Sequence, residues 1–135
     1  MRESARMIII DKDKILLMHR VKDGKEYYVL PGGGIEEGET PLIAVAREIK
    51  EETNLDVEVG PLMCKLSGDM SGERKEHYFV AKSFSGDLAL SGPEKERQSA
   101  DNKYSLEWIP LDRLGGLTLY HDEIKKKIMD GEWSG

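Results

Sequence analysis

The chain has 135 residues, of which 39% are hydrophobic and 34% charged, as expected for a single globular domain over 1–135. Its net charge of −6 argues against a general nucleic-acid binder, which would show a basic face, but does not exclude small phosphorylated ligands. The single cysteine, Cys64, excludes an intrachain disulfide, and no apolar run reaches membrane-spanning length. We therefore expect a cytoplasmic protein with neither nucleic-acid nor membrane partners.

Hydrophobic patterning predicts several strands and two helices in a mixed order. Apolar runs at 5–10 and 14–20, separated by Asp11-Lys12-Asp13, are typical of a β-hairpin. Further strands are predicted at 26–30, 56–67, 75–84 and 105–109, with loops at 32–34, 67–72 and 85–103. Helices are predicted at 41–53 and 121–130, the second with Ile124, Ile128 and Met129 on one face. This order predicts an α/β (α+β) fold in which helices and sheet pack in layers.

The helix predicted at 41–53 has a clear start and one apolar face. Thr40 is a favourable N-cap, and Pro41 suits the first helical position. At 100° per residue the apolar face contains the following side chains: Leu42, Val45, Ala46 and Ile49. We expect this face to lie against the core.

Three glutamates fall on the edge of the same helix. Glu48 and Glu52 are one turn apart, Glu51 lies one step further round, and Arg47 neighbours Glu51. Like charges at this spacing destabilise a helix by roughly 0.2–0.5 kcal/mol per pair, and a hard divalent cation such as Mg²⁺ would remove that cost because it prefers oxygen ligands. The alternative is a solvated charged face with Arg47 and Lys50 as partners.

Three consecutive glycines shortly before this helix favour the metal interpretation. Gly32, Gly33 and Gly34 follow Pro31 and would let a ligand approach the backbone closely, although a flexible turn is the simpler explanation for glycines alone. The loop is not a Walker loop, because no Gly-Lys-Ser/Thr follows, and it does not fit the dinucleotide pattern. A glycine-rich backbone next to a carboxylate-lined helix suits a metal-bound phosphate.

The segment GGIEEGETPLIAVAREIKEETNL, residues 33–55, resembles the Nudix box of the Nudix hydrolase family, in its MutT-like form. The matching positions are Gly33, Glu39, Arg47, Glu48, Ile49, Glu51, Glu52 and Leu55. Asn54 is the one departure, because the family has glycine there. Asparagine tolerates the left-handed backbone that ends many helices, so we expect a conservative replacement.

The resemblance implies an α/β/α sandwich with a mixed sheet, and hydrolysis of a pyrophosphate bond in a nucleoside diphosphate derivative, with a modified nucleoside triphosphate as the favoured substrate. It implies Mg²⁺ or Mn²⁺ as cofactor, held by Glu48, Glu52, Glu51 and the carbonyl of Gly32. Glu48 is also a candidate base, and Arg47 would orient a glutamate. Gly33, Gly34 and Arg20 are candidate substrate contacts, with a surface ion pair as an equal alternative for Arg20.

Some alternatives stay open at this point. A catalytically silent Nudix domain that binds a nucleotide or a protein would be expected to lose box carboxylates, and here all three are present. Non-hydrolytic chemistry such as isoprenoid isomerisation has no support beyond the box. A further carboxylate from the loop 85–103, Glu94 or Glu96, is an alternative to a merely solvated loop. The number of metal ions and the oligomeric state, with a homodimer among the alternatives, are not determined by the sequence.

The remaining conspicuous side chains have simpler explanations. The three histidines are scattered and are expected to be structural or solvent-facing. The aromatic candidates for base stacking are expected to contribute to sheet packing instead; they are Tyr27, Tyr28, Tyr78 and Trp108.

Overall fold

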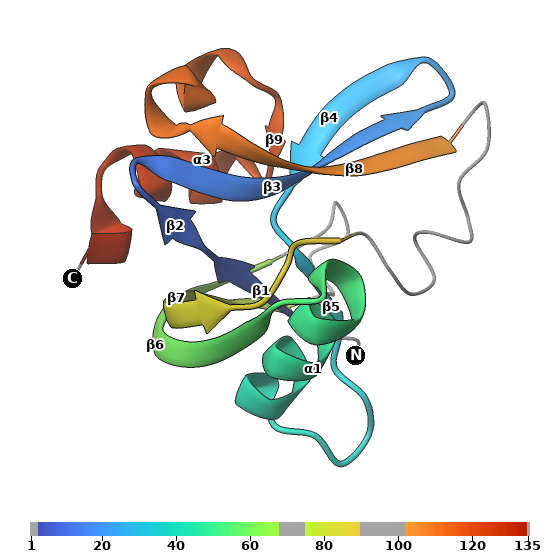
Figure 1. The fold of residues 1–135 in the computed structure, drawn as a ribbon, viewed down its shortest axis with the longest axis vertical. Helices are drawn as coiled ribbons and strands as arrows, with labels where there is room; N and C mark the ends of the chain where they lie inside the picture. Colours follow the sequence, from blue (N-terminus) through green and yellow to red (C-terminus); the bar gives the residue numbers. More distant parts are fainter. Residues whose placement is uncertain (1–2, 68–74, 90–101, 135) are drawn as a thin grey trace.

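The structure, a computed structural model, describes residues 3–67, 75–89 and 102–134, and its strands form two mixed sheets (Figure 1). The first sheet has the order β5 (Gly32–Gly34), β1 (Glu3–Ile8), β7 (Lys75–Ser85) and β6 (Asp56–Ser67). The second has the order β2 (Ile10–Asp11), β3 (Lys14–Lys22), β4 (Lys25–Val29) and β9 (Leu119–Tyr120), with β8 (Asn102–Pro110) also paired to β3. The helices are α1 (Pro41–Thr53), α3 (Asp122–Met129) and two 3₁₀ turns, η1 (Leu111–Gly116) and η2 (Glu132–Ser134).

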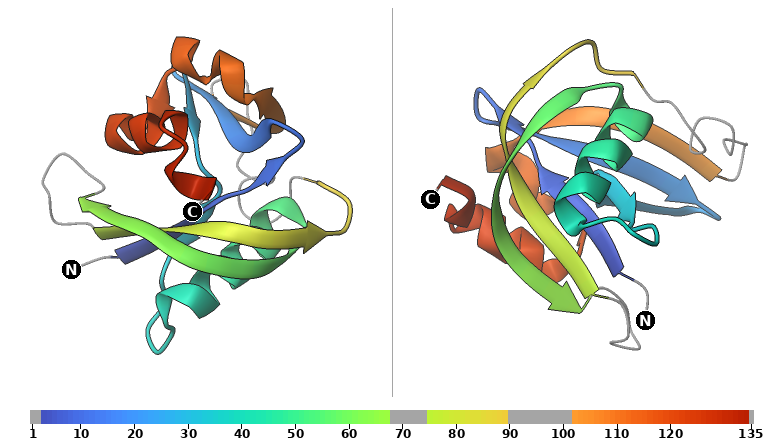
Figure 2. Two further views of the ribbon diagram at one scale, coloured as in Figure 1. Left: turned by 90° about the vertical axis from the view of Figure 1, so that its left-hand side faces the viewer. Right: turned by 90° about the horizontal axis from the view of Figure 1, so that it is seen from below.

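The two α-helices lie on opposite sides of the β layer, as the left view of Figure 2 shows. Alternate residues of one strand therefore enter different cores. On β1, Ile8 packs in the cluster that contains Ile124 of α3, whereas Met7 packs in the cluster that contains Val45 of α1. This arrangement confirms the predicted α/β/α sandwich. Within the described residues, no helix is long and apolar enough to span a bilayer.

The predicted hairpin of 5–10 with 14–20 is only partly correct. The first run divides at Ile9: β1 joins β5 and β7 in one sheet, and only Ile10–Asp11 pairs with β3 in the other. Lys12 and Asp13 make the turn with φ of 49° and 65°, which suits a two-residue hairpin. The division is hidden in the sequence because Ile8 and Ile9 are both fully buried, but in different cores.

Four further expectations need correction. Gly32–Gly34 is a strand rather than a loop, because it pairs with the edge of β1. The strand predicted at 105–109 begins at Asn102. Leu42 is 49% exposed, and Ala44 takes its place in the core. Met129 is 57% exposed, because α3 is short and buries only Ile124 and Ile128. Most of the predicted turn at 67–72 and of the loop at 85–103 lies outside the described residues.

The predicted left-handed end of α1 is confirmed. Asn54 has φ of 68°, and its N–H donates to the carbonyl of Lys50 at 3.0 Å. Its side-chain amide also donates to the carbonyl of Asp87 at 3.0 Å, a contact that glycine could not make. The departure from the family's glycine is therefore compatible with the helix end that the site needs.

We predict that Asn54→Gly changes the melting temperature little, because relief of positive-φ strain offsets the loss of an exposed hydrogen bond. Asn54→Val should be destabilised by about 1–3 kcal/mol, because a β-branched residue resists positive φ. Thermal melts with and without Mg²⁺ test this, and the Val variant should also bind the metal more weakly. Equal melting temperatures and equal metal affinities for the two variants would contradict the prediction.

Candidate active site

The last two turns of α1 bring the box glutamates against strand β5. The helix is fixed at its start by Thr40, whose hydroxyl accepts the N–H of Ile43 at 3.2 Å, and at its end by Asn54. Glu48 and Glu52 lie against the glycines of β5, while Glu51 is half-exposed and contacts Arg47. The side-by-side placement of Glu48 and Glu52 agrees with the helix geometry expected from their spacing.

Glycine is required at two positions of β5 for different reasons. At Gly33, a Cβ would overlap the carboxylate of Glu48, so the missing side chain is what lets Glu48 lie against the strand. At Gly32, φ is 143°, and a Cβ would overlap the carbonyl oxygen of Ala5 on β1. The N–H of Gly32 also points at Oε2 of Glu52, at 3.4 Å. These glycines therefore shape the place where the two carboxylates meet the sheet edge.

Arg47 is the hub that holds the carboxylates in place. Its Nε and Nη2 form a two-point contact with Glu39, at 2.7 and 2.8 Å. Its Nη1 donates to Glu48 at 2.9 Å and to Glu51 at 3.2 Å. Nη2 also donates to the carbonyl of Gly34, at 3.1 Å. One guanidinium thus ties the loop before α1, two glutamates of α1 and the glycine strand together, which is the orienting role expected for Arg47.

The contacts of Arg47 with Glu39 also shift the pKa values of both side chains. Hydrogen bonds from the Arg47 guanidinium, and then from the backbone N–H of Glu36, lower the pKa of Glu39 to about 2. The same contacts with Glu39 raise the pKa of Arg47 above its ordinary value. Both groups are therefore ionised throughout the neutral range. Glu39 is a structural partner of Arg47 rather than a metal ligand in this arrangement.

We predict that Gly33→Ala lowers turnover and weakens metal binding by about 10- to 100-fold, the effect of displacing a group that orients metal ligands. The added methyl group must push the Glu48 carboxylate away from β5. Titration with Mn²⁺ followed by electron paramagnetic resonance measures the affinity directly. Gly34→Ala is the matched control, because a Cβ there meets no atom within 4 Å. Equal metal affinities for the two variants would contradict the prediction.

The donor set fits a hard divalent cation. Nowhere in 3–67, 75–89 or 102–134 do three His, Cys, Asp or Glu side chains gather closely enough to hold a metal by themselves. Mg²⁺ in proteins usually takes one or two carboxylates and completes its shell with water and substrate phosphate oxygens. Glu48 beside Gly33 and Glu52 beside the N–H of Gly32 match that requirement, and Glu51 lies on the same helix.

A cavity of about 940 Å³ lies between β1, β4 and the segment that leads into α3. It is lined by Arg6, Arg20, Lys25, Glu26, Tyr27, Val29, Thr118, Leu119, Tyr120, His121 and Asp122. The cavity and the glutamates are linked by Arg6, which pairs in register with Gly32 of β5. The site therefore has two parts, a carboxylate cluster and a mixed polar and apolar cavity of a size typical for small-molecule ligands.

Arg20, predicted to contact substrate, lies on the cavity wall. Its guanidinium packs 4.5 Å from the ring of Tyr104 and 5.5 Å from that of Tyr27, and Nη2 donates to the Tyr104 hydroxyl at 2.8 Å. It forms no ion pair with a carboxylate in the part of the chain that the structure describes. Its positive charge therefore lies at the cavity wall, and its partners among the described residues are the Tyr104 hydroxyl and two aromatic rings.

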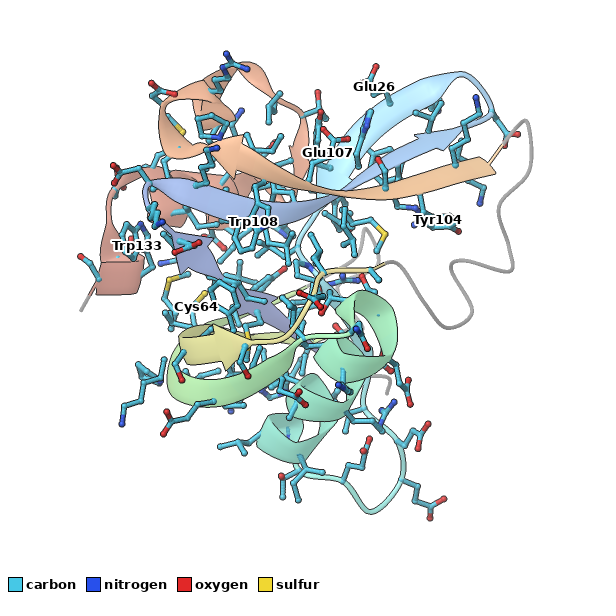
Figure 3. All side chains as sticks on the ribbon, viewed as in Figure 1. Glu26, Cys64, Tyr104, Glu107, Trp108 and Trp133 are labelled. Atoms are coloured by element: carbon cyan, nitrogen blue, oxygen red, sulfur yellow. The ribbon has the colours of Figure 1, made fainter. Side chains whose placement is uncertain are left out.

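The other conspicuous side chains are mostly structural. His19 is held between Glu107 and Glu26 at 2.7 and 2.6 Å; Figure 3 labels these two glutamates, which lie on β8 and β4, the two strands that pair with β3. His77 contacts Glu3 at 2.9 Å. Of the four aromatic candidates, only Tyr27 lines the cavity. Trp108, also labelled in Figure 3, packs on Phe84, Tyr28 stacks on His19, and Tyr78 is core.

Several cavity residues were missed by the sequence reasoning. The segment 118–122 reaches the cavity through parallel pairing of β9 with β4, and it includes His121, which also caps α3. Arg6 was missed because it lies in an otherwise apolar run. No local motif signals either group, since long-range pairing brings them together. Glu94 and Glu96 lie outside the described residues, so their role stays a prediction.

Comparison with known proteins agrees with this geometry. The model of the family described as the NUDIX domain matches residues 1–131. The chain is 36% identical over 126 residues to an ADP-ribose pyrophosphatase of Methanocaldococcus jannaschii, covering 90% of this chain and 69% of that protein. It is 28% identical to an 8-oxo-(d)GTP phosphatase of Mycolicibacterium smegmatis, covering 83% of this chain but 32% of that protein.

Solved structures show the same relationship. The crystal structure of a MutT NUDIX hydrolase from Burkholderia pseudomallei has a TM-score of 0.73 at 27% identity, covering 92% of this chain and 94% of that one. The fold and the family match thus define a Nudix-type hydrolase domain. The chain belongs to the Nudix family and is an enzyme of the hydrolase type.

Proposed function

We propose that this enzyme hydrolyses a pyrophosphate bond in a nucleoside diphosphate derivative and requires Mg²⁺ or Mn²⁺. The observation that carries the proposal is the placement of Glu48 and Glu52 against the glycine strand, next to a cavity whose wall includes Arg20. The cation, when bound, lowers the pKa of a water and neutralises charge on the phosphoryl group under attack. The phosphates would lie between Arg20 and the carboxylate cluster, and the nucleoside in the cavity.

The individual roles follow from the contacts. Glu48 and Glu52 are the proposed metal ligands, with Glu51 and the Gly32 carbonyl completing the set. Glu48 is also the candidate base that accepts the proton of the attacking water, since Arg47 holds it in a fixed orientation. The backbone of Gly33 and Gly34 is the proposed surface along which the phosphates lie.

The similar proteins are named for different substrates. Their names therefore support the proposed reaction, cleavage of a pyrophosphate bond, more strongly than they support any one substrate. They include an ADP-ribose pyrophosphatase, an 8-oxo-(d)GTP phosphatase and an RNA pyrophosphohydrolase. A modified nucleoside triphosphate is our favoured substrate class. The net charge of −6 gives little support for extended nucleic-acid partners. We also propose one catalytic domain over 1–135 and a cytoplasmic location, on the grounds of composition and the single cysteine.

A substrate screen tests the proposal. Nucleoside triphosphates, ADP-ribose and dinucleoside polyphosphates are each incubated with Mg²⁺ or with Mn²⁺. Release of phosphate and of pyrophosphate is followed separately, and the nucleotide products are separated by chromatography, because cleavage of ADP-ribose at its anhydride bond gives AMP and ribose 5-phosphate rather than either ion. At least one compound should be cleaved at its anhydride bond, and EDTA should abolish the reaction. A protein that binds nucleotides but cleaves none of them with either metal would instead support the catalytically silent alternative.

A further inference from the structure

Arg6 on the cavity wall pairs with a buried carboxylate, that of Glu76, and both residues lie outside the segment 33–55. Nε of Arg6 on β1 contacts Oε2 of Glu76 on β7 at 2.6 Å, and Glu76 is 1% exposed. The hydroxyl of Ser4 donates to the same oxygen at 3.2 Å, and Nη1 of Arg6 donates to the carbonyl of Leu30 at 2.8 Å. These contacts fix the guanidinium in one orientation.

One nitrogen of this guanidinium, Nη2, is in a position to bind a ligand. Nη2 of Arg6 makes no hydrogen bond to the described residues, and it is not among their fully buried unpaired atoms. The Arg6 side chain is 20% exposed and lines the cavity. Nη2 therefore presents N–H donors from a rigid support, which favours binding because little ordering remains to be done.

Charge indicates what kind of acceptor Nη2 suits. The carboxylate of Glu76 neutralises Arg6 at close range, so Arg6 adds little net positive charge to the cavity. Arg20 differs, because its described partners are a neutral hydroxyl and aromatic rings. Phosphate therefore suits Arg20, whereas Arg6 suits a neutral acceptor such as a carbonyl oxygen or a ring nitrogen.

Other residues of the cavity wall suit a planar heterocycle. Val29 and Leu119 supply apolar surface, and Tyr27 and Tyr120 supply rings on which a base can stack. A donor at a defined position beside apolar and aromatic surface is a usual means by which such cavities select one ligand.

We propose that Arg6, positioned by Glu76, is a specificity-determining residue that donates a hydrogen bond to the exocyclic oxygen of a 6-oxopurine base. Adenine would bring an amino group against the same donor and leave both unpaired. Guanine and hypoxanthine offer O6, with N7 beside it, to an arginine. The inference rests on the proposed function only in that the cavity holds the nucleoside, and it requires no catalytic step.

Inosine monophosphate and adenosine monophosphate are the probes, because their bases differ in the 6-substituent and the associated N1 proton. Their dissociation constants are measured by calorimetry without metal, so that turnover plays no part. The wild type should bind inosine monophosphate about 10- to 100-fold more tightly, the discrimination expected of a good arginine contact to a base edge. Equal affinities would overturn the proposal.

The test variant replaces both partners, because removing one would leave a buried charge unpaired. Arg6→Met/Glu76→Leu keeps the volume roughly constant and should fold, which a thermal melt verifies. Its preference for inosine monophosphate should disappear. Glu76→Gln, whose amide oxygen can still accept from Arg6, should retain the direction of the preference. Lys25→Met removes another cation of the cavity wall and should retain the preference in full.

A folded double variant that still prefers inosine monophosphate would overturn the assignment of Arg6. The assignment of Arg6 would also be overturned if Lys25→Met lost the preference for inosine monophosphate as completely as the double variant. Any cation of the cavity wall would then be sufficient to explain the preference. The two proposals fail separately. A protein that cleaves no nucleotide but discriminates between the monophosphates contradicts only the proposed function, whereas equal cleavage of ATP and ITP with equal binding contradicts only the inference.

Discussion

Glu52→Gln is expected to lower turnover at least about 100-fold, the scale seen when one electrostatic or acid–base element is removed from an active site. Glutamine has nearly the same shape and can still accept the N–H of Gly32, so the fold has no steric reason to change. What is lost is the negative charge that a divalent cation requires. The measurement is kcat on the best substrate of the screen, at saturating Mg²⁺.

The same variant should melt at the same temperature or a higher one. Glu52 is only 4% exposed, so folding without metal removes a carboxylate from water and places it on the same helix edge as Glu48. Neutralising it removes both costs, and these outweigh the lost attraction to the Arg6 guanidinium, which keeps Glu76 as its direct partner. A variant that loses activity while its stability is unchanged or increased identifies a residue that serves activity and lowers the stability of the fold.

Glu48→Gln should lose activity on a similar scale, because Glu48 is both a proposed ligand and the candidate base. Glu37→Gln is the control, since Glu37 is an exposed glutamate of the same segment that no proposed role involves. Added Mg²⁺ should raise the melting temperature of the wild type and of this control but not of the Glu52 variant. Near wild-type turnover in both the Glu48 and the Glu52 variants would show that the site is assigned wrongly.

The sequence was sufficient to predict the parts of the site that local geometry determines. Helix bounds at 41–53 followed from Thr40 and Pro41, and the spacing of Glu48 and Glu52 placed them on one edge whatever the tertiary structure. Asn54 could be predicted to adopt positive φ from its residue type and its position after the helix. These predictions need only backbone geometry within a few residues.

The parts that depend on distant pairing could not be predicted. Ile8 and Ile9 are equally apolar, and nothing in their order shows that they enter different cores. Gly32–Gly34 is a strand only because β1 offers an edge there, and glycine carries no strand signal of its own. The cavity is assembled from β1, β4 and the residues before α3, and Arg6 is connected to Glu76 across 70 residues of sequence.

Arg47 should be the most sensitive residue that does not itself act as a metal ligand. We expect Arg47→Lys to lower turnover or metal affinity by about 10- to 100-fold, as is usual when a partner that orients metal ligands is altered. Lysine keeps the charge, but its single nitrogen cannot bridge Glu39, Glu48 and the carbonyl of Gly34 as the planar guanidinium does. Rate and Mn²⁺ affinity should therefore fall although the net charge is unchanged.

Stability should respond to pH in a way that identifies the Arg47–Glu39 contact. Folding lowers the pKa of Glu39 from 4.5 to about 2. Ionised Glu39 therefore stabilises the fold at neutral pH, and this contribution is lost as the pH falls from about 4.5 to about 2. In Arg47→Lys the two-point contact is broken and the Glu39 pKa should return toward its ordinary value, so this contribution is already small at neutral pH.

The free-energy difference between wild type and Arg47→Lys should therefore be largest near neutral pH and smaller at about pH 3, as measured by urea unfolding at both. Lys50→Met is the matched control on the same helix. Its exposed ion pair with Asp56, at 3.3 Å, is worth little, so the wild-type pH profile should be retained. If the difference for Arg47→Lys were the same at both pH values, the lysine would cost stability through lost packing alone, and the guanidinium would not be the group that lowers the Glu39 pKa.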